Sequence, residues 1–382
     1  MANYKIFLLP VVALMALSGC VEPVDPQFNV PDVKTSERVV SVSLHQAQIE
    51  AAPADYSYVQ RYLEIDIEGN FQNPRRINQL QGDTLWIVSG LDAGTHYLYR
   101  EGATDGLISR YGPVCEFQTL PAVEVSGFSL SVWDQTGTPV AVDDTLTFGF
   151  FYTDATTGKD EQDMSNLPFN YDPVSQRWSM PVEIEPTSVP HTFYVYSPYD
   201  DRLKSKDGIS VSSHDDVDVL YGKSDDITLD NYRAAISMKH AKAKIRFSVT
   251  RDSKDNVGAS FKSYGIEQSD AQLPSYGTFD IVTEQLQITA WTNQLERWKS
   301  FTPTETATVL ELYVLPCNVQ SKQFFLTNTD GSTYYVDIPD GAWEAGNEYT
   351  YPVSVRLNQL EIGDVTITPW NEVGSGSVII YN

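Results

Sequence analysis

The chain has 382 residues, with 26 lysines and arginines against 51 aspartates and glutamates, so its formal net charge is −25. Such an acidic surface repels phosphate backbones, which excludes nucleic acid as the expected partner. The hydrophobic fraction of 41% is enough for two or three domains with their own cores. With only three cysteines, a disulfide scaffold is excluded, and we expect Cys115 and Cys317 to be buried free thiols rather than a disulfide between domains.

The N-terminus has the pattern of an exported, lipid-anchored protein. Lys5 precedes an apolar run from Ile6 to Leu17 that is too short to span a bilayer. The following residues, Ser18-Gly19-Cys20, resemble the end of the lipobox of bacterial lipoproteins. The resemblance implies that residues 1–19 are a signal peptide and that lipid on Cys20 holds the protein at the outer membrane. An ordinary secretory signal with a chance cysteine is the alternative.

Residues 20–36 are rich in proline and acidic residues and show no periodicity, which predicts a flexible tether. From 37 to 121 apolar and polar residues alternate, as in Leu63, Ile65 and Ile67, which is typical of half-buried strands in a β-sandwich. The stretch Leu91–Arg100 resembles part of a fibronectin type III domain. There, the hydroxyl of Tyr97 would bond back to the backbone as a tyrosine corner.

Beyond residue 121 the same all-β pattern continues. Strand candidates are separated by turns rich in aspartate, glycine and proline, and no long amphipathic helix is apparent. The candidates are Phe128–Val132, Thr145–Tyr152, Phe193–Tyr196, Ile236–Thr250, Phe324–Leu326, Tyr334–Val336, Tyr349–Val355 and Val365–Trp370. We therefore predict an all-β fold of three serial β-sandwiches, covering residues 37–121, 122–240 and 241–382.

Several short motifs in this region occur in the order found in one family. They are Asn170–Asp172 with Trp178, Phe193–Tyr199, Asp218–Tyr221, Met238–Ile245, Tyr349–Tyr351 and Ile367–Trp370. Together they resemble the fimbrillin-like surface lipoproteins of Bacteroidetes. The resemblance implies two transthyretin-like domains after the fibronectin-like one, a role in fimbriae or cell adhesion, and assembly with other pilin subunits by strand donation.

One arginine near the tether bears on processing. In related pilins a protease cuts after an arginine to remove an N-terminal strand and open the groove for a donated strand. The corresponding candidate here is Arg38, although an exposed tether residue is the alternative. A cut there would leave the fibronectin-like domain attached and would not open the fimbrillin-like groove. We therefore expect an anchor, tip or accessory subunit that keeps its lipid.

No residue pattern indicates catalysis, a metal or a cofactor, so we expect no enzyme. The five histidines are scattered, and His240 is expected to satisfy a buried backbone group. The acidic clusters Asp215–Asp218 and Asp225-Asp226 lack the spacing of an EF-hand loop and are expected to be solvated turns.

Two tryptophans are candidate contacts for a host or bacterial surface ligand. Most tryptophans of the chain are expected to pack in the core or at sheet edges. For Trp291 and Trp298, which flank a polar stretch, the alternative is a loop with exposed rings. They support the alternative function, a glycan-binding outer-membrane lipoprotein of a polysaccharide-uptake system.

Overall fold

The structure is a computed structural model that describes residues 32–53, 60–80, 82–130, 147–172, 177–251, 260–270, 272–356 and 359–370. Every helix or strand in these ranges is a β-strand, which confirms the predicted all-β fold. No helix in the described ranges could cross a membrane. The chain forms two compact units. Unit 1 comprises Met1–Glu124, Glu183–Ser188 and Thr228–Tyr232, and unit 2 comprises Val125–Val182, Val189–Ile227 and Arg233–Asn382.

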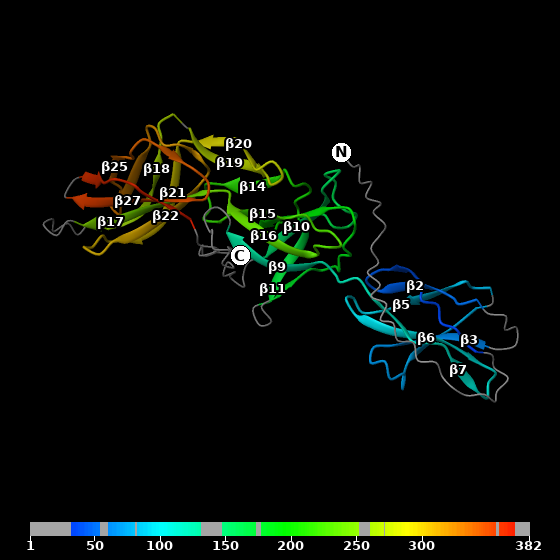
Figure 1. The fold of residues 1–382 in the computed structure, drawn as a ribbon. Helices are drawn as coiled ribbons and strands as arrows, with labels where there is room; N and C mark the ends of the chain where they lie inside the picture. Colours follow the sequence, from blue (N-terminus) through cyan, green and yellow to red (C-terminus); the bar gives the residue numbers. More distant parts are fainter. Residues whose placement is uncertain are drawn as a thin grey trace, which may run out of the picture. The chain divides into compact units, whose positions relative to one another are not determined.

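Unit 1 is built from two antiparallel sheets (Figure 1). The first has the order β1 (Val39–Val42), β2 (Gln46–Glu50), β5 (Leu85–Ser89). The second has the order β4 (Arg75–Asn78), β3 (Gln60–Asp66), β6 (His96–Thr104), β7 (Ser109–Tyr111), and β8 (Cys115–Gln118) also pairs with β6. Alternate residues of these strands, among them Ala47, Ile49, Leu63 and Ile65, are buried in one core, as expected for a sandwich.

The core of unit 1 contains the predicted tyrosine corner. The ring of Tyr97 is buried, and its hydroxyl accepts a hydrogen bond of 2.8 Å from the backbone N–H of Asp92. Trp86 on β5 supplies the largest side chain of this core and is 2% exposed. Unit 1 also includes two segments from further along the chain. The carbonyls of Ile184 and Tyr232 accept hydrogen bonds from Val123 and Glu124, respectively.

Unit 2 contains five sheets, whose strand orders follow. The largest is β12 (Arg177–Ser179), β11 (Leu167–Asp172), β10 (Phe148–Asp154), β13 (His191–Ser197), β15 (Leu220–Ser224), β16 (Arg233–His240), β9 (Glu124–Leu130). A second is β14 (Ile209–Ser212), β19 (Leu273–Asp280), β20 (Gln285–Thr292). A third is β22 (Thr308–Val314), β17 (Ala243–Arg251), β27 (Asn347–Arg356), β28 (Gln359–Ile362), with β29 (Thr366–Pro369) also on β27. The remaining two are β21 (Gln294–Phe301), β18 (Phe261–Glu267), β24 (Gln323–Asn328), β25 (Thr333–Asp337), and the pair β23 (Cys317–Asn318), β26 (Ala342–Trp343).

Among the described residues of unit 2, separate hydrophobic clusters form around the sheets. One includes Phe151, Tyr196 and Phe279, and another includes Phe247 and Phe324, whose stacked rings lie 3.8 Å apart. The hairpin β19–β20 follows residue 240, yet it pairs with β14 and contributes Phe279 to the first cluster. Because this hairpin crosses the predicted boundary, the division of the region into two domains at residue 240 stays a prediction.

Candidate functional site

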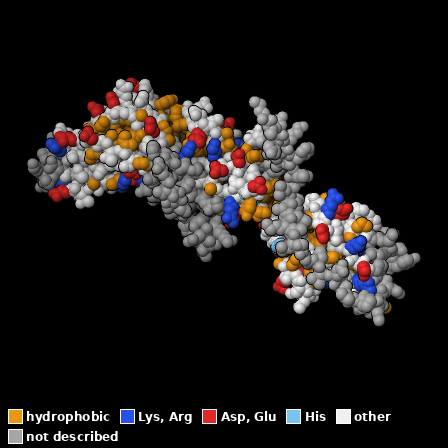
Figure 2. Space-filling model, in the orientation of Figure 1, with side chains coloured by type: hydrophobic (Ala, Val, Ile, Leu, Met, Phe, Trp, Pro, Cys, Tyr) orange, Lys and Arg blue, Asp and Glu red, His pale blue; other side chains and the backbone are white. Residues whose placement is uncertain are grey.

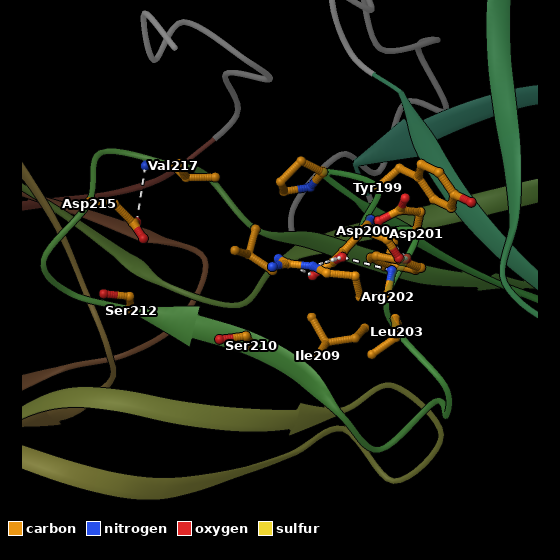
Figure 3. A pocket seen from close by; sticks show the side chains of 13 residues that line it. Tyr199, Asp200, Asp201, Arg202, Leu203, Ile209, Ser210, Ser212, Asp215 and Val217 are labelled. Atoms are coloured by element: carbon orange, nitrogen blue, oxygen red, sulfur yellow. Dashed lines mark hydrogen bonds and ion pairs between the residues drawn. The ribbon is translucent and has the colours of Figure 1, made fainter. Parts of the chain in front are cut away.

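A groove of about 650 Å³ lies in unit 2 between the segment that follows β13 and the segment that leads from β14 to β15. Its apolar lining includes Leu203, Ile209, Val217 and Val219, and its polar lining includes Tyr199, Asp200, Asp201, Arg202, Ser210, Ser212 and Asp215 (Figure 3). Polar residues outnumber apolar ones among these, whereas the lining of a small-molecule site is usually mostly apolar.

Two of the three carboxylates that line the groove, those of Asp200 and Asp215, are engaged by cations of the same chain. Asp200 accepts hydrogen bonds of 2.9 and 3.0 Å from the guanidinium of Arg202, and the pKa of Asp200 is lowered chiefly by this contact. Oδ1 of Asp215 lies 2.7 Å from Nζ of Lys242. No cluster of ligating side chains suited to a metal occurs among the described residues.

The acidic segment beside the groove is fixed by three ion pairs. Besides Asp215 with Lys242, Asp216 pairs with Arg297 at 2.7 Å, and Asp218 pairs with His240 at 3.0 Å. The side chains of Asp215 and Asp216 are 45% and 50% exposed, as expected for a solvated turn, whereas that of Asp218 is 7% exposed. The segment is tied to strands that lie far from it in sequence.

His240 lies at the centre of these contacts and is 1% exposed. Its Nδ1 is within 3.0 and 3.1 Å of the two carboxylate oxygens of Asp218. Its Nε2 has no hydrogen-bond partner among the described residues. His240 is thus buried as predicted, but the group it satisfies is a carboxylate and not the expected backbone group.

Two buried lysines, one just before β17 and one on it, also take part in ion pairs. Lys242 and Lys244 are both buried, and burial lowers the pKa of Lys242. Nζ of Lys244 lies 3.5 Å from Glu348 and 3.6 Å from Glu311, on the two strands that flank β17. Sequence reasoning missed these ion pairs, although lysines at alternate positions of an otherwise apolar strand were a visible signal.

The sequence-predicted site residues are not brought together. Cys20 lies outside the described residues. Arg38 directly precedes β1, its side chain is 74% exposed, and it pairs with Glu50 at 3.0 Å. Cys115 and Cys317 form no disulfide with each other and are only partly buried.

Trp291 and Trp298 are 55% and 72% exposed, respectively. They lie on strands β20 and β21 and not in the alternative loop, and these strands belong to different sheets. At the opposite edge of the sheet that contains Trp298, Tyr335 on β25 is 44% exposed. Figure 2 shows hydrophobic side chains gathered over the part of unit 2 that contains β18 and β25. Sequence reasoning missed Tyr335 because its strand pattern resembles that of any hairpin strand.

Comparisons with known proteins agree with this architecture. The sequence profile of a family described as fimbrillin-like matches residues 136–370. One similar solved structure is a candidate cell adhesion protein of Bacteroides uniformis ATCC 8492, with a TM-score of 0.51, 15% identity, and coverage of 65% of this chain and 99% of the other. Another, from Bacteroides ovatus ATCC 8483, has a TM-score of 0.53, 15% identity, and coverage of 65% and 97%. At this identity the similarity shows a shared fold. No curated protein matches the chain.

Proposed function

Because the chain belongs to the fimbrillin-like family, we propose that it is a non-enzymatic fimbrial subunit or adhesin at the cell surface. Lipid on Cys20 would hold it at the outer membrane as an anchor, tip or accessory subunit. The observation that carries this role is the additional sandwich of unit 1, whose strands β1 to β8 precede the matched region and share their own core. Its tyrosine corner supports a fibronectin type III-like spacer.

The placement of β9 argues against a simple shaft subunit. This strand pairs with β16 at the edge of the seven-stranded sheet, so the chain fills that edge itself. Because β9 follows Arg38 in the chain, a cut at Arg38 would leave β9 attached to its sheet. No arginine between Arg110 and Arg177 offers a cut close to β9. Strand donation by a partner pilin would therefore require β9 to leave or another edge to be used.

The mature N-terminus of the protein tests this proposal. We would isolate the chain from native membranes and from sheared fimbriae and analyse its N-terminal peptide by mass spectrometry. An acylated Cys20 in material that co-purifies with fimbriae is the expected result. A chain that starts at Val39 in both fractions would overturn the retained lipid, and absence from fimbriae together with unchanged adhesion of a deletion strain would overturn the role.

Glycan binding is the second candidate function, and exposed Trp298 and Tyr335 on one sheet favour it. Calorimetry with a panel of oligosaccharides would test it on the wild-type chain and on Trp291→Ala, Trp298→Ala and Tyr335→Ala. Binding that is lost in these variants and kept in Asp201→Ala, at an exposed residue of the groove, would promote this function. No heat of binding with any oligosaccharide would reject it.

A further inference from the structure

The residues just before Arg38 are packed against unit 1 rather than extended away from it. Val33 is 8% exposed and packs against Ala103 on β6. Oγ1 of Thr35 accepts a 3.1 Å hydrogen bond from the N–H of Glu101. The carbonyl of Ser36 accepts a 2.8 Å hydrogen bond from the hydroxyl of Tyr99. We call residues 32–36 the clasp; all of them lie in the segment that the sequence predicts to be a flexible tether.

The surface under the clasp is shaped to receive it. The carboxylate of Glu101 is fully buried and accepts hydrogen bonds from the N–H groups of Ser36, at 3.2 Å, and Ala52, at 2.8 Å. A Cβ atom at Gly112 would lie 2.4 Å from Oγ1 of Thr35 and 2.8 Å from the backbone of the clasp. Glycine at this position therefore leaves the space that the clasp occupies.

Arg38 combines an exposed side chain with a backbone that is held on both sides. Its carbonyl accepts a 2.9 Å hydrogen bond from the N–H of Glu50, and Val39 begins β1. A protease must bind several residues around the cut in an extended form. Cleavage of such a segment follows the fraction of molecules in which it is locally open.

We propose that the clasp keeps Arg38 as a latent cleavage site, which an arginine-specific protease can cut only when the clasp has opened. In that step water adds across the Arg38–Val39 peptide bond, which leaves a carboxylate on Arg38 and an amine on Val39. The cut separates Cys20 and any lipid it carries from both units. This inference rests on the proposed retention of the lipid on Cys20 and adds that the clasp protects the bond whose cleavage would release the chain.

Cleavage kinetics test the clasp in the mature full-length chain with a purified arginine-specific protease as the probe. Thr35→Ala removes one clasp hydrogen bond, and Gly112→Ala pushes Thr35 out of its place. Both variants should speed the appearance of the Val39 N-terminus by about tenfold or more, since cleavage follows the open population. Lys34→Ala, at an exposed clasp position, is the matched control and should leave the rate unchanged.

Cuts after arginines elsewhere in the chain distinguish opening of the clasp from general unfolding. Cuts after Arg75 and Arg76, on β4 of the same unit, would rise equally if unit 1 as a whole were unfolding. Cuts after Arg202, whose side chain is 85% exposed in unit 2, report protease activity alone. Unchanged cleavage at Arg38 in both variants, or an equal rise at Arg75 and Arg76, would overturn the clasp. An acylated Cys20 as the sole native N-terminus would instead argue against natural processing and leave the clasp intact.

Discussion

The imidazole ring of His240 lies flat against the indole ring of Trp370, with ring centroids 3.8 Å apart and an interplanar angle of 11°. Trp370 follows β29, which pairs with β27, whereas His240 ends β16 in a different sheet. Tyr313 on β22 contacts the same indole at 5.2 Å. One buried tryptophan therefore joins residues of two strands, β16 and β22, that belong to different sheets and are distant in sequence.

Replacing Trp370 by alanine should lower the free energy of unfolding of unit 2 by about 3–5 kcal/mol, the usual cost of removing a buried tryptophan. Chemical denaturation followed by circular dichroism would measure it. The matched control is Trp298→Ala, since that ring is 72% exposed and its loss should change stability by no more than about 0.5 kcal/mol. Equal effects of the two substitutions would contradict the packing role of Trp370.

Asp218→Ala should cost about 1–3 kcal/mol because it leaves Nδ1 of buried His240 without its hydrogen-bond partner. The same substitution in a His240→Phe background should cost less, because no ring nitrogen is then left unsatisfied. Denaturation of the four proteins of this double-mutant cycle measures the coupling directly. Additive effects would show that the two side chains do not depend on each other.

The parts of this fold that the sequence predicted are those governed by local patterns. Alternation along β3 and the spacing around Tyr97 need only neighbouring residues to be interpreted. The clasp was missed because Ser36 and the carboxylate it contacts on Glu101 are 65 residues apart, and the clasp itself has no periodicity. The parallel pairing of β17 with β27 is likewise a long-range contact that no local pattern encodes.

Gly265 on β18 should tolerate no side chain. A Cβ atom there would lie 2.1 Å from the carbonyl oxygen of Leu295 and 2.7 Å from the ring of Phe325. Because the first of these is backbone of the paired strand, Gly265→Ala should destabilise unit 2 by about 1–3 kcal/mol or more. Thermal unfolding would measure the change. Gly341→Ala is the control, since nothing lies within 4 Å of its Cβ position, and a similar loss in both would reject the steric explanation.

Cys317 should react slowly with alkylating reagents as long as unit 2 is folded. Burial raises the pKa of its thiol from 9.0 to about 11, and Lys322 opposes this only in part. Since the thiolate is the reactive form, its fraction at pH 8 falls by about 100-fold relative to a thiol with the ordinary pKa. Iodoacetamide labelling of the Cys317 peptide, followed by mass spectrometry, should show this difference between native and urea-unfolded protein. The native rate should keep rising with pH towards 11, whereas the unfolded chain should level off near 9. A native profile that levels off near 9 would show that the thiol does not experience the buried environment, and circular dichroism at each pH would confirm that the protein is still folded.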